Sequence, residues 1–258
     1  MPTGSADLIL KNGRIYTVDR GRSWASAVAV KSGRIVAVGD EAAVAPLAGG
    51  ETRTVDLKGA TLLPGMIDVH AHLLMGGQAE LFELRVPPTA SFEVLIERVR
   101  EAATHAPEGG WIIGGQWGSD LLPRLNTTEA LAALDAAAPG RAVMLRDDTY
   151  HNRWVNSEAL RRAGVDRATA DPDKGSFGRD SASGALTGMM IEAAAGIVER
   201  TIVQSGHFTP EMDLASMARS ISTLNSFGVT AFLDAASAGS ARRTGPSWSP
   251  SDCCSSPW

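Results

Sequence analysis

Cysteine is almost missing from this chain: the two cysteines among its 258 residues, Cys253 and Cys254, are adjacent and close to the end. Two neighbouring cysteines provide no disulfide framework, and their spacing is not that of a zinc finger. We therefore set aside the small disulfide-rich and zinc-finger classes.

Long apolar runs, basic clusters and a leader peptide are missing as well. No stretch is apolar for long enough to span a bilayer, and residues 1–7 lack the basic and apolar regions of a signal peptide. The net charge is −5, and no cluster of lysine and arginine suggests a nucleic-acid partner. With 44% hydrophobic residues there is ample material for a core. We expect a cytoplasmic globular protein without nucleic-acid or membrane partners.

Histidine is scarce, but two of the five histidines stand two residues apart in residues 66–72, Met-Ile-Asp-Val-His-Ala-His. Read as a strand after the turn at Pro64-Gly65, this run places Asp68, His70 and His72 on one face. Two imidazoles on neighbouring pleats reach a single cation, and neutral imidazole is a common ligand for zinc and similar ions. By spacing alone such a pair is more often two surface or core histidines, but the Pro-Gly turn, the apolar strand and Asp68 on the same face strengthen the metal interpretation.

This run resembles the first barrel strand of the amidohydrolase superfamily, where Pro-Gly-hydrophobic-hydrophobic-Asp-x-His-x-His supplies two metal ligands. Short apolar strands precede it, and turns at Asn12-Gly13 and Lys31-Ser32-Gly33 predict two hairpins. Their Asn-Gly-Arg-Ile and Gly-Arg-Ile-Val-Ala-Val-Gly patterns resemble the superfamily's N-terminal module. The resemblance implies an α/β fold: a β-sandwich portion in residues 1–63, then the first part of a metal-dependent hydrolase (β/α)8 TIM barrel in residues 64–236.

Two further stretches are candidate parts of the site. Residues 73–77 are expected to form a loop leaving the carboxyl end of the histidine strand, where barrel enzymes place their chemistry. The strand of residues 111–117 ends in two glycines, which allow close approach of a backbone or a ligand, and in Trp117. Trp117 is either a core residue or a wall of the substrate pocket. His105 ends a helix that begins at Ser91, and we interpret it as structural.

A second distinctive block begins where the apolar strand of residues 142–145 opens into a polar loop that contains His151. Its position after a strand predicts a cleft residue, and Asn156 or Ser157 caps the next helix. The His-x-x-x-Val-Asn-Ser-x-Ala-Leu pattern resembles the YtcJ-like branch, amidohydrolase family 3. Residues 184–194 resemble the branch's Gly-x-x-Thr-Gly-x-x-x-Glu-x-Ala block, in which Glu192, expected on a helix, is either a cleft residue or a solvated one.

The last ordered elements are expected to be a long helix that starts at Pro210 and a strand over residues 229–234, ending in Asp234. Asp234 is a candidate cleft residue that matches no metal ligand of the family. Residues 237–258 contain no aliphatic side chain larger than alanine, so we expect disorder. We favour an out-of-frame or truncated end there; the alternative is a genuine flexible tail.

The resemblance implies a metal-dependent amidohydrolase that uses a metal-activated water on a non-peptide C–N bond of a small amide-like or cyclic amide substrate. His70 and His72 would hold a divalent metal, with zinc favoured, and His151, Trp117 and Glu192 would contact the substrate. The family's bridging lysine, two later histidines and catalytic aspartate cannot be located, and the aspartate is expected beyond the chain end. Two alternatives stay open: an inactive fragment with a partial metal site, and a chain whose partner completes the barrel. A homo-oligomer is also left open.

Overall fold

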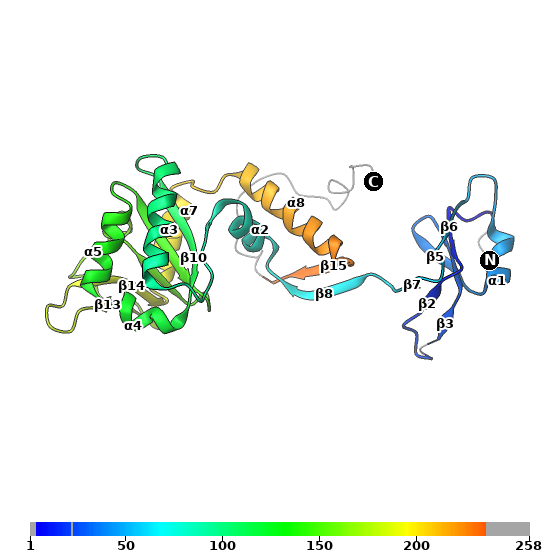
Figure 1. Cartoon of the computed structure of the whole chain (residues 1–258), viewed down its shortest axis with the longest axis horizontal. Helices are drawn as coiled ribbons and strands as arrows, with labels where there is room; N and C mark the ends of the chain where they lie inside the picture. Colours follow the sequence, from blue (N-terminus) through cyan, green and yellow to red (C-terminus); the bar gives the residue numbers. More distant parts are fainter. Residues whose placement is uncertain (1–3, 22, 236–258) are drawn as a thin grey trace. The chain divides into compact units, whose positions relative to one another are not determined.

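A computed structural model of the chain describes residues 4–21 and 23–235 (Figure 1). The predicted tail of residues 237–258 lies outside the described residues. The described residues divide into two compact units, one formed by residues 4–21, 23–69 and 225–233, the other by residues 70–224 with Asp234 and Ala235. Among the described helices, none has the length and apolar character needed to cross a bilayer.

Two small sheets make up most of the first unit. Its elements are β1 (Leu8–Lys11), β2 (Arg14–Tyr16), β3 (Trp24–Ala25), β4 (Ala27–Lys31), β5 (Arg34–Gly39), α1 (Glu41–Val44), a 3-10 turn (Ala45–Leu47), β6 (Arg53–Asp56) and β7 (Thr61–Leu62). One sheet has the order β5-β4-β1-β6 and the other β3-β2-β7. Ile9, Ala27, Ala29 and Val44 are buried against one another and join α1 to the larger sheet.

One of the two predicted hairpins is confirmed. Strands β4 and β5 pair in antiparallel fashion, with Lys31 opposite Arg34, and the two residues between them, Ser32 and Gly33, both have positive φ. The hairpin predicted at Asn12-Gly13 is wrong. Both edges of β1 are taken, by β4 and by β6, so the turn instead carries the chain into β2 of the other sheet.

The predicted histidine strand, β8 (Met66–Ala71), pairs with β15 (Val229–Asp234). Met66 N–H donates to the Gly228 carbonyl at one end, and Ala235 N–H donates to the Ala71 carbonyl at the other, so the strands run in the same direction. The helix predicted to start at Pro210 is α8 (Pro210–Ser226), which leads into β15. Within the described residues this sheet has two strands, and Ile67 and Val69 are 68% and 72% exposed.

The larger part of the second unit is a mixed sheet with the strand order β13-β14-β12-β11-β10-β9. The strands of this sheet and the helices between them are β9 (Leu84–Arg85), α3 (Phe92–His105), β10 (Trp111–Trp117), a 3-10 turn (Ser119–Leu121), α4 (Leu122–Leu125), α5 (Thr128–Ala137), β11 (Ala142–Asp147), β12 (Asn152–Val155), α6 (Ser157–Arg162), β13 (Gly175–Arg179) and β14 (Leu186–Glu192), followed by α7 (Ala195–Gln204). Strands β9, β10 and β11 are parallel, and the other three are antiparallel to their neighbours.

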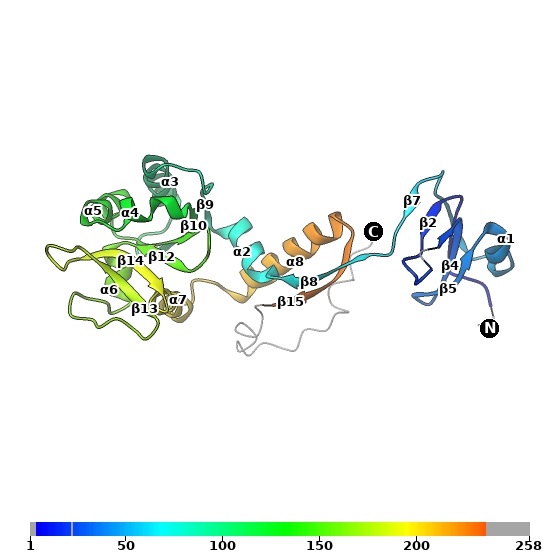
Figure 2. The same cartoon turned by 90° about the horizontal axis from the view of Figure 1, so that it is seen from below.

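Alternation along the buried strands divides the core between two layers of helices. Ile112 and Val143 pack with α3 and α5, whereas Ile113 and Met144 pack with α6 and α7. Figure 2 shows the helices on both faces of the sheet. Because both faces are covered, the strands read in the sequence as continuous apolar runs.

Two expectations for the second unit need correction. Residues 73–77 begin a helix, α2 (Leu73–Phe82), rather than a loop, and Glu192 ends a strand rather than lying on a helix. The described strands form four separate sheets, none of which closes into a barrel. In sequence, the six-stranded sheet is inserted between β8 and β15, which pair with each other.

Candidate functional site

The two predicted metal ligands lie at the carboxyl end of β8. His70 lies in the strand. His72 follows it and is the N-cap residue of α2, without a capping hydrogen bond from its side chain. Both side chains are exposed, and their rings stand perpendicular with centroids 5.1 Å apart. Since β15 runs parallel to β8, Asp234 lies at the same end of this sheet.

The two imidazoles match part of a metal coordination shell. A structural or catalytic zinc takes three or four protein ligands. In the part of the chain that the structure describes, no group of three or more His, Cys, Asp or Glu residues is arranged to hold a metal ion. His70 and His72 are therefore two candidate ligands that, within the described residues, do not form a complete metal site.

A cavity of about 670 Å³ lies at the carboxyl ends of the parallel strands β9, β10 and β11. Its wall includes Gly76 and Ala79 of α2, Val86 and Pro87 after β9, and Gln116 at the end of β10. Ligands of open α/β sheets bind beyond the carboxyl ends of parallel strands, and ligand pockets commonly have volumes of roughly 300–1,000 Å³. Position and size together make this cavity a candidate binding site.

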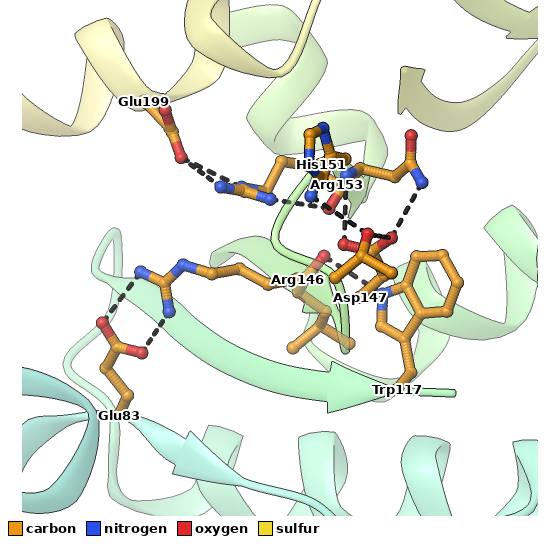
Figure 3. Close-up of polar contacts among 10 residues, drawn as sticks. Glu83, Trp117, Arg146, Asp147, His151, Arg153 and Glu199 are labelled. Atoms are coloured by element: carbon orange, nitrogen blue, oxygen red, sulfur yellow. Dashed lines mark hydrogen bonds and ion pairs between the residues drawn. The ribbon is translucent and has the colours of Figure 1, made fainter. Parts of the chain in front are cut away.

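One wall of the cavity is a buried ion pair between Arg146 of β11 and Glu83, the residue between α2 and β9 (Figure 3). The pair is bidentate, with Arg146 Nη2 donating to Glu83 Oε1 at 2.8 Å and Nη1 donating to Oε2. Burial disfavours the charged guanidinium, but the hydrogen bonds and the charge of Glu83 outweigh that cost and raise the pKa of Arg146. The pair joins α2 to the sheet at the rim of the site.

Two polar side chains in the wall are held by unusual backbone conformations. Gln116 and Tyr150 have φ of 77° and 64°, in the left-handed region that residues other than glycine seldom adopt. Gln116 Nε2 donates to the Tyr150 hydroxyl oxygen at 2.6 Å. Non-glycine residues in the left-handed region are enriched at functional sites, where the surrounding structure compensates for the strain.

The loop that presents Tyr150 and His151 is organised by Asp147, whose side chain is fully buried (Figure 3). Its carboxylate accepts hydrogen bonds from Thr149 Oγ1 at 2.6 Å, from Asn152 Nδ2 at 2.8 Å and from the Asn152 backbone at 3.1 Å. These bonds close residues 147–152 into a compact turn at the carboxyl end of β11.

His151 and Glu192, two predicted substrate contacts, meet across this end of the sheet. His151 Nδ1 lies 3.0 Å from Glu192 Oε2, and both side chains are exposed. The hydrogen bond and the charge of Glu192 raise the pKa of His151. The structure therefore brings together two residues that are 41 positions apart in the sequence.

We expect Glu192→Gln to lower the pKa of His151, because the neutral amide removes the charge that favours the imidazolium. An NMR titration of the imidazole resonances measures the pKa of His151. Glu158→Gln, which removes the carboxylate that pairs with Arg161 and Arg162, is the control and should leave the pKa of His151 unchanged.

The pair of His151 with Glu192 also makes the stability of the fold depend on pH. Because the pKa of His151 is raised in the folded state, the pair stabilises the fold below about pH 6.5. This effect is lost as the pH rises through the raised pKa. Equal titration curves in wild type and Glu192→Gln would contradict the pairing.

The comparisons with known proteins agree with this architecture. The family model described as the amidohydrolase family, Amidohydro_3, matches residues 53–247, which is most of the chain. The chain belongs to the amidohydrolase family.

Relatives from the same family are considerably longer than this amidohydrolase chain. The N-substituted formamide deformylase of Arthrobacter pascens is 34% identical over 198 residues, which are 76% of this chain and 36% of the relative. The amidohydrolase YtcJ of Bacillus subtilis is 31% identical over 207 residues, 79% of this chain and 38% of the relative. A solved metal-dependent hydrolase of Pyrococcus horikoshii OT3 is 26% identical with a TM-score of 0.61, covering 87% of this chain and 42% of that one. The chain thus spans well under half the length of these three proteins.

Trp117, the third predicted substrate contact in this amidohydrolase chain, lies in the core instead. It is 1% exposed, and its Nε1 donates to the Leu145 carbonyl at 3.2 Å. The register of β10 against β11 shifts between Gly115 and Trp117, which leaves Gln116 outside and turns the indole inward. The extra residue, Gln116, places the Trp117 side chain on the opposite face of β10 from the face that simple alternation predicts.

Sequence reasoning missed the residues that line the cavity. His151, Glu192 and Trp117 are not among them, whereas Glu83, Arg146, Gln116 and Tyr150 are. A charged arginine within the buried run of β11 was an available signal, because such a group needs a partner. Its partner, Glu83, is 63 positions away, and nothing local pointed to it.

Proposed function

We propose that the protein is a metal-dependent amidohydrolase that hydrolyses a C–N bond other than a peptide bond in a small amide-like or cyclic amide substrate. The observation that carries the proposal is the His-x-His pair at the carboxyl end of β8, a strand that pairs with β15 and runs in the same direction. In this proposal β8 and β15 are neighbouring strands of a (β/α)8 barrel, and the two sheets of the first unit belong to its β-sandwich module.

His70 and His72 would hold the metal, for which zinc suits imidazole ligands. A bound divalent metal polarises the scissile carbonyl and makes hydroxide available near neutral pH. The similarity to an N-substituted formamide deformylase and to an amidohydrolase supports a C–N bond as the target. His151, held by Glu192, would contact the substrate from the loop after β11.

Zinc binding tests the proposal. We expect His70→Ala and His72→Ala each to weaken zinc binding by about 100-fold or more, since loss of an outer-shell partner alone typically costs 10–100-fold. Equilibrium dialysis with elemental analysis measures the affinity. His105→Ala is the matched control, because His105 ends α3 and hydrogen-bonds within its own helix. Equal affinity in wild type and in His70→Ala, or an equal loss in His105→Ala, would contradict the assignment.

A second candidate is a metal-binding chain without turnover. It is favoured by the finding that, among the described residues, no group of His, Cys, Asp or Glu side chains offers three metal ligands. Ammonia or amine release by the zinc-loaded chain separates the two candidates: turnover near a typical 10 per second supports the enzyme, and zinc binding without detectable release supports the second candidate.

A further inference from the structure

Two arginines stand on either side of a glycine in the wall of the cavity at the carboxyl ends of β9, β10 and β11. Arg85 of β9 and Arg146 of β11 both lie opposite Gly115 of β10 in the strand register. Residues opposite each other on neighbouring strands project to the same face of a sheet, and a strand spacing of about 4.8 Å puts the two Cα atoms about 10 Å apart. All three residues line the cavity, and Gly115 places no side chain between the two guanidinium groups.

Within the described residues, one of these two arginines is neutralised by a carboxylate and the other is not. Arg146 donates to Glu83 through both of its Nη atoms. Arg85 is exposed on the edge strand β9, and it takes part in no ion pair or side-chain hydrogen bond with residues 4–21 or 23–235. Its guanidinium group is therefore available to a ligand.

The second carboxylate of the wall, Glu80, is already held by Arg219 of α8 at 2.5 Å. The hydrogen bond from Arg219 is the main cause that lowers the pKa of Glu80, and the charge of Arg85 adds to this shift, so Arg85 faces the same part of the wall. With Arg219 included, three guanidinium groups stand against the two carboxylates Glu80 and Glu83. One positive charge is left over, and Arg85 carries it at the surface of the cavity.

A single unneutralised guanidinium group favours a ligand with one carboxylate. The planar fork of arginine matches a carboxylate in a bidentate pair, which is stronger than a hydrogen bond between neutral groups. A phosphate dianion would bring its second charge close to Glu80 and Glu83, and a cation would be repelled by Arg85. The Tyr150 hydroxyl accepts from Gln116 Nε2 at 2.6 Å, so its own hydrogen is left as a further donor for an acidic ligand.

Apolar residues complete this side of the wall. Val86, Pro87 and Pro88 follow Arg85 in the chain and line the cavity with it. We propose that the cavity binds a small monocarboxylate, whose carboxylate pairs with Arg85 and whose apolar body packs against these three residues. The site goes beyond the proposed hydrolysis, because neither the histidine pair nor a scissile C–N bond has a part in it.

Binding of benzoate, a rigid monocarboxylate, to the full chain freed of metal by a chelator tests the proposal by saturation-transfer NMR. We expect Arg85→Gln to weaken binding about tenfold, the value of one hydrogen bond to a charged group. Arg85→Lys, which keeps the charge but not the planar fork, should restore part of the affinity. Arg98→Gln is the matched control, because Arg98 is an exposed arginine of the same unit that pairs with Glu101 and does not line the cavity. It should bind benzoate as wild type does.

Two substitutions that break the same ion pair should change benzoate binding in opposite directions. Glu80→Gln removes a carboxylate that competes for Arg85 and should tighten binding about threefold. Arg219→Gln frees Glu80 to pair with Arg85 and should weaken binding about threefold. If the pair of Glu80 with Arg219 acted only by joining α2 to α8, both substitutions would weaken binding, and that result would overturn the proposal.

Two comparison ligands with the same ring test the ligand class. Benzamide, which is neutral, and phenyl phosphate, which is a dianion, should each bind at least about fivefold more weakly than benzoate. No saturation transfer from wild type to benzoate, wild-type affinity in Arg85→Gln, equal binding of benzamide, or tighter binding of phenyl phosphate would each overturn the proposal. A wild-type chain that binds benzoate but no zinc would overturn the proposed metal chemistry and leave the cavity assignment supported.

Discussion

Replacing Asn156 with alanine is expected to lower the free energy of unfolding by about 3 kcal/mol, because a buried side chain that makes three hydrogen bonds is lost. Asn156 is 2% exposed. Its Oδ1 accepts from the Ala159 backbone at 3.0 Å, as the N-cap of α6, and from the Val143 backbone at 2.9 Å. Its Nδ2 donates to the Arg141 carbonyl at 2.8 Å. The substitution leaves all three backbone groups without this partner.

Urea unfolding followed by tryptophan fluorescence measures the effect, since Trp117 and Trp154 are buried in the same unit. The control is Thr127→Ala, which removes the N-cap bond from the Ala130 backbone and the bond that the Thr127 hydroxyl donates to the Arg124 carbonyl, and it should cost about 1 kcal/mol. Equal losses for the two variants would show that the bonds of Asn156 to β11 contribute nothing beyond capping.

The Val-Asn-Ser run, one of the patterns that resemble the family, has a structural role here. Asn156 fastens the start of β11 to the start of α6, and Ser157 donates its hydroxyl to Asp135 of α5 at 2.6 Å. The run therefore holds the scaffold together beneath the loop that presents His151. A motif that identifies a family need not touch the substrate.

Local signals in the sequence predicted the elements well. Ser91 and Asn156 each cap the helix that follows them, and the Ser32-Gly33 turn closes a hairpin. These features depend on a few neighbouring residues, so local chemistry decides them. The Asn12-Gly13 turn has the same local signature, but long-range pairing of β1 on both edges overrode it.

The candidate site was predictable only where its residues are sequence neighbours. His70 and His72 share a strand end, so two-residue spacing was enough to place them together. The pair of His151 with Glu192 and the pair of Arg146 with Glu83 each join distant segments. The bulge at Gln116 also reverses the side on which Trp117 lies, and no alternating pattern reports such an extra residue.

Gly77→Ala is expected to destabilise the second unit by about 2–3 kcal/mol, as overpacking of a closed interface typically does. Gly77 is buried where α2 crosses α8, and an added Cβ would overlap the Ser216 carbonyl and lie 2.7 Å from the Ser216 Cα. Backbone cannot swing aside as a flexible side chain does, so the two helices must separate. Ser216 is itself fully buried, with its hydroxyl bound to the Met212 carbonyl. Urea unfolding measures the loss.

Gly76→Ala, one residue earlier in the same helix, is the matched control. A Cβ there meets only Ser220 Oγ at 3.9 Å, an ordinary contact, so alanine should stabilise the helix by up to about 1 kcal/mol through its higher propensity. Opposite signs for the two substitutions would place the effect at the helix contact rather than in α2 itself. If Gly77→Ala proves as stable as Gly76→Ala, the close approach of α2 to Ser216 is wrong.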